Sequence, residues 1–237
     1  MKKLIIIILV LLGIIVIYSV VEGVRKHKEE ANQMTKNETV GAAETVNFDG
    51  EYVVDAKASK ATWTGKKKIL VEWIDKGTID VKSGEVNIKG SETDWAGTEG
   101  KIVFDMTTIR SSQTKGEAGE SSKLDGHLKS ADFFDVAKYP ESVFVLKKVT
   151  KNNDGTFNLD GDLTIKDVTK PVTLASITNL DVVDGSDGKA IEARGRVTFN
   201  RADYNVKFGS DSFFDNLGDN VIENEVALDL VIVAVKK

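Results

Sequence analysis

The chain has 237 residues, enough for one large β-rich domain and an N-terminal appendage. Its net charge of −5 argues against a nucleic-acid-binding protein, because such proteins gain much of their affinity by neutralising phosphates. The absence of cysteine excludes disulfides, thiolate metal sites, cysteine nucleophiles and a lipid-modified N-terminal cysteine.

The first 23 residues are predicted to form a hydrophobic helix that serves as a membrane anchor or a signal peptide. Lys2 and Lys3 precede an uncharged run from Leu4 to Val21 that consists mainly of Ile, Leu and Val. This run is just long enough to span a bilayer, and no convincing cleavage site follows it. Lysines at this position stay in the cytoplasm, so we expect the remaining chain to be extracytoplasmic, either tethered to the inner membrane or secreted after signal cleavage.

Residues 24–47 are predicted to form a linker, and residues 48–237 a single β-rich domain. The linker is polar, carries mixed charges and shows no hydrophobic periodicity. Beyond it, apolar and polar residues alternate in about eight long segments, most clearly at 156–165. This pattern predicts an antiparallel sheet that either closes into a barrel or forms a two-sheet sandwich.

Residues 77–90 are predicted to form a hairpin. The apolar residues change parity between Val81 and Val86, and the turn residues Ser83 and Gly84 lie between them. A change of parity moves side chains to the other face of a sheet, so we expect the chain to turn at this point.

The segment 124–140 is predicted to form a short amphipathic helix that covers one opening of the barrel. Leu124 and Leu128 are four residues apart, and Phe133 and Phe134 add apolar bulk a turn later. Side chains at this spacing share one face of a helix and pack it against an apolar surface.

Several segments occur in an order that is characteristic of one family. They are Asp105–Ile109, Leu124–Asp135, Tyr139–Phe144, Gly161–Val172, Asn200–Tyr204 and Leu217–Val221. Together they resemble the YceI-like family of bacterial envelope proteins, over about residues 52 to 235. The resemblance implies an eight-stranded, antiparallel, lipocalin-like barrel that holds a polyisoprenoid or an isoprenoid quinone outside the cytoplasm. It implies no cofactor other than this bound ligand, and it supplies no catalytic residues.

The resemblance gives the inward-facing side chains of the strands a candidate role, because an isoprenoid chain gains about 25 cal/mol per Å² of buried apolar area. The candidate lipid-cavity residues are Trp63, Phe104, Met106, Phe144, Leu146, Leu163, Ile165 and Phe199. Three small residues, Gly161, Ala193 and Gly195, are expected to leave room for a void rather than to fill it.

The candidate residues at the mouth of the barrel are His127, Phe133, Phe134, Arg201 and Tyr204. The two phenylalanines are expected to seal or gate the cavity. Arg201 is expected to form an ion pair with Asp203 that fixes the mouth, or else to meet a polar headgroup. His127, the single histidine of the predicted domain, is expected to be a buried, hydrogen-bonded structural residue, with a ligand contact or a polar clamp as the alternative.

No catalytic or metal site is predicted. The chain has no Gly-x-Ser-x-Gly motif, and a domain with one histidine and no cysteine argues against a transition-metal site. The leading hypothesis is a non-enzymatic lipid-binding protein that meets the membrane through its N-terminal helix. The alternatives are a structural or stress-response envelope protein with a filled core and, as a minor one, an enzyme that acts on isoprenoid lipids. A homodimer is compatible with the sequence.

Overall fold

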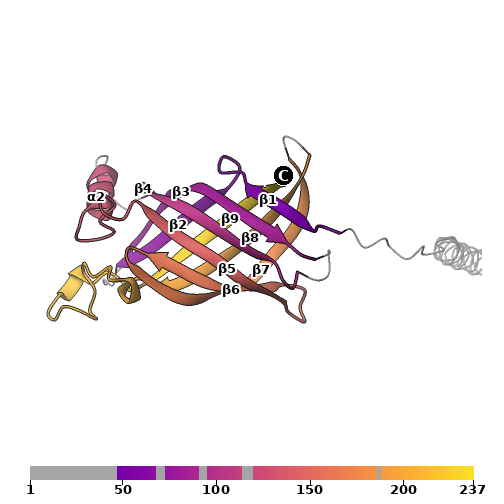
Figure 1. Cartoon of the computed structure of the whole chain (residues 1–237). Helices are drawn as coiled ribbons and strands as arrows, with labels where there is room; N and C mark the ends of the chain where they lie inside the picture. The colour runs from indigo at the N-terminus through magenta and orange to yellow at the C-terminus, as the bar shows by residue number, and fades with distance from the viewer. Residues whose placement is uncertain (1–46, 68–72, 91–94, 114–119, 186–187) are drawn as a thin grey trace, which may run out of the picture. The chain divides into compact units, whose positions relative to one another are not determined.

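The computed structural model describes residues 47–67, 73–90, 95–113, 120–185 and 188–237 (Figure 1). The predicted N-terminal helix and residues 24–46 of the predicted linker lie outside this part of the chain. Among the described residues, no helix combines the length and the apolar character needed to cross a bilayer. The elements are β1 (Gly50–Val54), β2 (Lys60–Lys67), β3 (Trp73–Ile88), β4 (Glu99–Gln113), α2 (Glu120–Lys129), β5 (Glu141–Lys151), β6 (Phe157–Ile165), β7 (Val168–Gly185), β8 (Gly188–Asn200), η1 (Arg201–Tyr204), η2 (Gly218–Asn220) and β9 (Glu225–Lys236).

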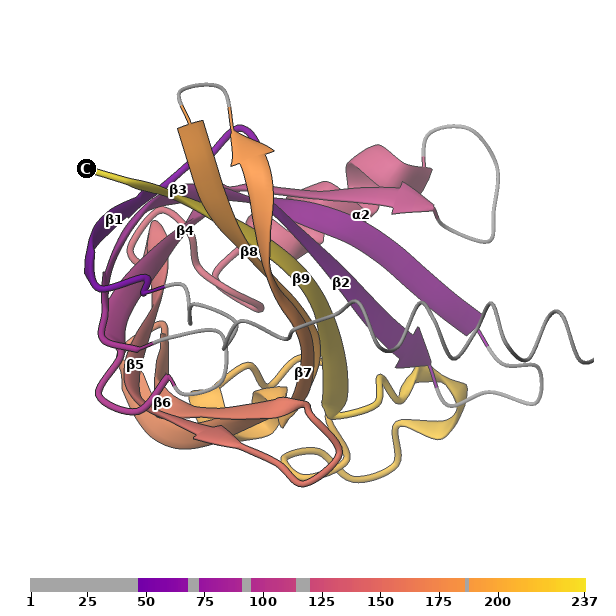
Figure 2. The same ribbon diagram turned by 90° about the vertical axis from the view of Figure 1, so that its right-hand side faces the viewer.

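The strands form one antiparallel sheet that closes on itself. The sheet has the order β1-β3-β2-β9-β8-β7-β6-β5-β4, and the pairing of β3 with β4 joins its two sides. Figure 2 shows the strands wrapping around a common interior. Closure pairs backbone groups that an open sheet would leave at its edges. The all-β prediction is therefore confirmed, and the barrel is the correct alternative to the sandwich.

The described residues contain nine strands rather than the predicted eight. β1 and β2 share one position in the barrel, between β3 and β9. β1 pairs with the C-terminal parts of β3 and β9, whereas β2 pairs with the N-terminal half of each. Between them, Asp55 Oδ1 accepts hydrogen bonds from the N–H groups of Lys57 and Ala58, which forms a turn. The count differs because this turn divides one strand position into two strands.

β3 runs without interruption from Trp73 to Ile88, so the predicted hairpin at Ser83 and Gly84 is wrong. The pairing of β3 with β4 shifts register at three points, the last of them just after Val81. Such a β-bulge adds one residue to a strand and reverses the parity of the residues beyond it. Val81 and Ile88 are accordingly both buried, although they are seven residues apart.

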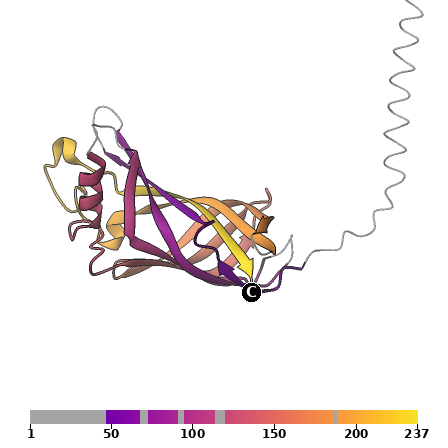
Figure 3. The same cartoon turned by 90° about the horizontal axis from the view of Figure 1, so that it is seen from above.

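α2 lies at one end of the barrel, together with the segment that follows β8 (Figures 1 and 3). The predicted helix over 124–140 is only partly correct, since α2 ends at Lys129 and residues 130–139 form turns. The backbone N–H and the hydroxyl of Ser130 both donate to the carbonyl oxygen of His127, which competes with continuation of the helix.

The apolar face of α2 is turned toward the barrel interior. Leu128 is buried, and Leu124 packs against the main core cluster. Phe133, in the turn after the helix, is also buried and belongs to that cluster. The helix and its following turn therefore act as a cover, as the sequence pattern predicts.

Aromatic rings pack together at the opposite end of the barrel. The ring of Trp95 stacks on Phe48 with centroids 5.5 Å apart and meets Phe157 edge-on at 6.4 Å. All three side chains are buried. Stacked and edge-to-face pairs of this kind stabilise a core beyond the area that they bury. The two ends of the barrel therefore differ, since rings pack closely at one end and a helix covers the other.

Gly77→Ala is expected to destabilise the barrel by about 1–3 kcal/mol, because an added methyl group would overpack a filled site. Gly77 pairs with Trp63 across β2 and β3, and a Cβ there would lie 2.5 Å from the indole ring and 2.0 Å from the carbonyl oxygen of Arg110. Gly65→Ala is the matched control, since nothing lies within 4 Å of its Cβ position. Denaturant titration compares the two variants, and equal free energies of unfolding would contradict the close packing of Trp63 on Gly77.

Candidate binding cavity

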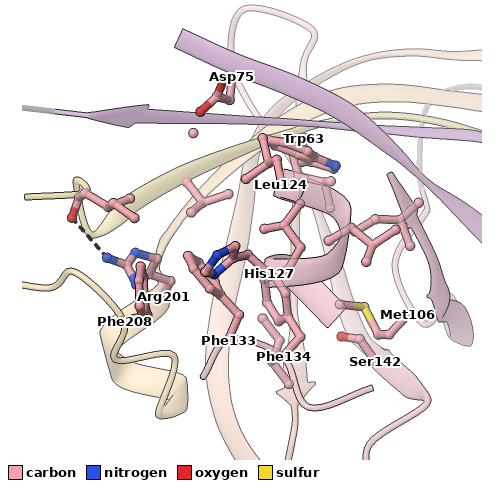
Figure 4. Close-up of a pocket in the computed structure, with 18 of the residues that line it drawn as sticks. Trp63, Asp75, Met106, Leu124, His127, Phe133, Phe134, Ser142, Arg201 and Phe208 are labelled. Atoms are coloured by element: carbon pink, nitrogen blue, oxygen red, sulfur yellow. Dashed lines mark hydrogen bonds between the residues drawn. The ribbon is translucent and has the colours of Figure 1, made fainter. Parts of the chain in front are cut away.

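A cavity of about 450 Å³ lies inside the end of the barrel that α2 covers (Figure 4). Side chains from the strands form its wall, and side chains from α2, the turn after it and the segment after β8 form its cover. The wall includes Trp63, Ile79, Phe104, Met106, Ile109, Leu163, Ile165, Phe199 and Leu228, and the cover includes Leu124, His127, Leu128, Phe133, Phe134 and Phe208.

A second cavity of about 120 Å³ lies toward the opposite end of the barrel. Its lining includes Ile88 and Trp95, which belong to that end of the molecule. Phe104, Leu163 and Leu228 line both cavities, so the two spaces meet at these side chains. The two cavities therefore adjoin along the barrel interior, with these three side chains between them.

All eight residues predicted from strand parity to line a lipid cavity border one or both of these spaces. Trp63, Met106, Ile165 and Phe199 line the larger cavity, Phe144 and Leu146 line the smaller one, and Phe104 and Leu163 line both. Their placement follows from the two-residue period of a strand, which sends alternate side chains to the same face. Contact between these side chains and a lipid stays a prediction.

The space directly above two of the three small residues that were expected to leave room is already filled. A Cβ on Gly161 would lie 2.7 Å from the ring of Phe144, and a Cβ on Gly195 would lie 2.0 Å from Cδ1 of Ile177. The larger neighbours already occupy the space above each glycine. Ala193 and Gly195 nevertheless both line the smaller cavity, whereas Gly161 borders neither.

Aromatic side chains gather at the mouth of the larger cavity. The ring of Phe133 lies 5.3 Å from that of Phe208 and 6.2 Å from that of Phe134. Of the predicted mouth residues, Tyr204 does not border the cavity; it is buried behind Phe199, which it meets edge-on at 5.7 Å. Burial raises the pKa of the Tyr204 phenol to about 12, so this side chain is neutral at physiological pH.

His127 is exposed, so the prediction of a buried, hydrogen-bonded histidine is wrong. Its ring borders the cavity and lies 5.6 Å from that of Phe208 (Figure 4). Within the described part of the chain, the imidazole has no hydrogen-bond partner. Asp125, two residues away, instead accepts hydrogen bonds from the backbone N–H and the hydroxyl of Ser111. The arrangement of a base oriented by an acid, which hydrolytic catalysis requires, is not formed by these residues.

Arg201 is a buried cation that holds the cavity mouth together. Only 2% of it is exposed, and its guanidinium donates to the carbonyl oxygens of Val206, Ile222 and Glu223 at 2.8, 3.0 and 3.0 Å. The predicted ion pair with Asp203 is wrong, because Asp203 is exposed and these carbonyl oxygens take the place of its carboxylate. Loss of solvation lowers the pKa of Arg201 to about 10, so the side chain still carries its charge at neutral pH.

The polar groups of the interior are concentrated at the α2 end. Charged residues around the larger cavity are Lys66, Lys67, Lys123 and Arg201, with Asp75 and Glu223 as the acidic ones. The polar residues that border the smaller cavity, among those that the structure describes, are Thr98 and Arg194. The interior therefore has one mixed, mainly basic end and one apolar end.

Phe208 and Leu228 both line the larger cavity but were not predicted from the sequence to do so. β9 has apolar residues at both parities, which hides its inward face. Glu225 and Asp229 mark the outward parity, where Asp229 pairs with Arg196. This signal assigns Leu228 to the interior. Phe208 lies in an irregular segment, where no periodicity points inward or outward.

Comparison with known proteins places the chain in one family. A family model described as the YceI-like domain matches residues 52–234. A UPF0312 protein of Vibrio parahaemolyticus is 31% identical over 169 residues, which cover 70% of this chain and 82% of that protein.

Two solved structures share the fold. BcnA of Burkholderia cenocepacia has a TM-score of 0.56 at 22% identity, over 77% of this chain and 99% of that one. A polyisoprenoid binding domain from Saccharophagus degradans, implicated in plant cell wall breakdown, has a TM-score of 0.50 at 16% identity, over 78% of this chain and 98% of that one. At these identities the likeness shows the fold alone.

Arg201→Met is expected to lower the free energy of unfolding by roughly 2–4 kcal/mol, because it leaves three carbonyl oxygens without their charged donor. Arg196→Met is the matched control. Arg196 makes a bidentate pair with Asp229, but its side chain is 60% exposed, so its loss should change stability little. Thermal or chemical denaturation measures both variants. A similar, small effect for the two would show that the buried clamp contributes little.

Proposed function

Because the chain belongs to the YceI-like domain family, we propose that its barrel binds the chain of a polyisoprenoid or an isoprenoid quinone. The solved domain that is described as polyisoprenoid binding has the same fold, which supports this ligand class. The observation that carries the proposal is the apolar tract formed by the two cavities, which meet at Phe104, Leu163 and Leu228.

The size and lining of the tract suit an elongated apolar ligand. The larger space alone, about 450 Å³, falls in the range of roughly 300–1,000 Å³ that is usual for small-molecule sites. Transfer of an isoprenoid tail from water into such a lining gains about 25 cal/mol per Å² of apolar area. Binding needs no covalent bond and no hydrogen bond along the tail.

The distribution of polar groups sets the direction of the ligand. In this proposal the tail extends toward the smaller cavity, and the head lies at the α2 end, near His127 and Lys123. A polar head placed in the smaller cavity would lose its hydration without gaining partners, which is costly. The basic side chains around the larger cavity favour a head that is an anion or a hydrogen-bond acceptor.

The alternatives fit the interior less well. The side chains of a filled core normally leave few voids larger than a water molecule. Two adjoining apolar cavities do not fit such a core. An enzyme that works through His127 would need an orienting acid, whereas the nearby Asp125 is engaged by Ser111. A binding protein is therefore the function that the geometry supports best.

The location of the protein is part of the same proposal. The charged N-terminus followed by an apolar run supports an extracytoplasmic domain that is tethered to the inner membrane or released from it. An isoprenoid carrier in that compartment would have its ligand reservoir in the adjacent bilayer.

Native mass spectrometry of the gently purified full chain is expected to show a non-covalent apolar adduct, which organic extraction then identifies as an isoprenoid. The same protein, stripped of lipid, should take up geranylgeraniol delivered on cyclodextrin. A chain that is empty when purified and that also fails to load would overturn the proposal.

Leu163→Trp is expected to reduce the amount of bound isoprenoid several-fold, because the larger ring would project into both cavities. The stability cost should stay below the roughly 1–3 kcal/mol of an overpacked core, since the ring enters existing space. Val145→Trp, on the exposed face of β5, is the control and should leave binding unchanged. Loading by geranylgeraniol and denaturant titration check the pair. A large loss of stability with normal loading would indicate a filled core instead.

A further inference from the structure

Exposed phenylalanines are concentrated in one short segment at the covered end of the barrel. Among the described residues, five large hydrophobic side chains are exposed, and three of them are Phe208, Phe213 and Phe214, at 39%, 42% and 49%. The other two, Val53 and Val145, are aliphatic residues on separate strands. A cluster of exposed aromatic rings marks an interaction surface more often than a single exposed residue does.

The tip of this segment is held in a defined conformation. Ser210 is fully buried, and its carbonyl oxygen accepts hydrogen bonds from the N–H groups of Phe213 and Phe214. The side-chain amide of Asn224 donates to Asp211 Oδ1 and to Ser212 Oγ. The two exposed rings are therefore presented by a hydrogen-bonded turn, not left on a loose chain.

The base of the segment is also fixed. The carbonyl oxygen of Gly209 accepts a hydrogen bond of 2.7 Å from the N–H of Ile222, which links the start of the segment to the chain that leads into β9. Arg201 holds the carbonyl oxygens of Val206 and Ile222 with one guanidinium. A rigid base means that the aromatic tip keeps its place relative to the cavity mouth.

The segment is continuous with the cavity. Phe208 lines the larger cavity and packs against Phe133 and His127 at its mouth. Phe213 and Phe214 follow within six residues, and the segment lies at the same end of the barrel as α2 (Figures 1 and 3). Aromatic side chains thus extend from the interior to the outer surface at one place.

The charges of the segment indicate how it would bind. Lys207 lies over the ring of Phe213, with its Nζ 4.9 Å from the centroid, so its stem covers apolar surface while its charge reaches water. Within residues 207–216, the two acidic residues Asp211 and Asp215 outnumber the one basic residue, Lys207. Attraction to anionic lipids would therefore not drive binding to a membrane. The contribution that remains is the burial of the exposed phenylalanine rings.

We propose that residues 207–216 dock on the surface of a lipid bilayer by inserting Phe213 and Phe214, and that the bound isoprenoid passes between membrane and cavity beside Phe208. This inference rests on the proposed function, because the ligand of that function is stored in a bilayer. When the cavity mouth lies against the bilayer, an apolar tail can move between them without entering water. Exposure of apolar surface to water is unfavourable. Aromatic rings at the membrane interface, with a long basic side chain beside them, are typical of such contacts.

The absence of cysteine allows a site-specific test on the full chain. Asp215→Cys places an environment-sensitive fluorophore beside the exposed rings, and Thr150→Cys places it on β5 near the opposite end of the barrel. Both labelled proteins are mixed with phosphatidylcholine vesicles that carry a quencher in their acyl chains. We expect quenching at position 215 and not at position 150. Phe213→Ser with Phe214→Ser in the 215-labelled protein should weaken the interaction roughly tenfold or more.

The outcomes separate this proposal from the proposed function. The double serine variant should load geranylgeraniol from cyclodextrin as the parent chain does, yet take it up more slowly from vesicles. Quenching at neither position, equal quenching at both, or no effect of the serines overturns the docking proposal, and normal cyclodextrin loading would then leave the proposed function intact. A parent chain that is empty when purified and also fails to load from cyclodextrin would instead refute the proposed function.

Discussion

The closure of the sheet by the β3–β4 ladder is the constraint on which the rest of the structure depends. A closed barrel gives every inward-facing side chain the same interior, whose width is set by the number of strand positions. With β1 and β2 sharing one position, eight positions surround the core. A barrel of this size can be filled by side chains or can hold one small ligand. The size of the inward side chains and the covering of the two ends decide whether the barrel is filled or has room for a ligand.

The two ends of the barrel are covered by different means, and this difference gives the interior a direction. Trp95, Phe48 and Phe157 pack their rings directly against one another at one end. At the other end, a helix and an irregular segment span the opening, and a space of about 450 Å³ remains beneath them. The interior therefore has a cavity beneath its cover at the α2 end and closely packed aromatic rings at the other end.

The parity of the strands predicted the cavity lining, because side chains in a strand alternate with a period that sequence reveals directly. The failures occurred where that period does not hold. The bulge in β3 after Val81 changed which alternate positions face the interior. A hairpin turn produces the same change in the sequence pattern, so the bulge was mistaken for one. His127 and Phe208 lie outside the strands, so the sequence offered no period by which to place either ring.

The partner of Arg201 was not predictable for a different reason. An arginine two residues from an aspartate suggests an ion pair, yet the chain turns through η1, and the guanidinium meets carbonyl oxygens from residues 206, 222 and 223. Long-range contacts with backbone atoms leave no trace in local sequence. In the same way, the space above Gly161 and Gly195 is filled by Phe144 and Ile177, which are near in the fold and distant in the chain.

Arg201 connects the cover of the larger cavity to the segment that carries Phe213 and Phe214. Its guanidinium lies 5.7 Å from the ring of Phe133, which covers the cavity, and it binds both ends of the segment that carries Phe213 and Phe214. A hydrophobic side chain of the same size would pack here but would leave three carbonyl oxygens unpaired, and solvent cannot reach a site that is 2% exposed. The buried guanidinium of Arg201, paired with neutral carbonyl oxygens, therefore holds the cavity cover and the aromatic segment in fixed positions.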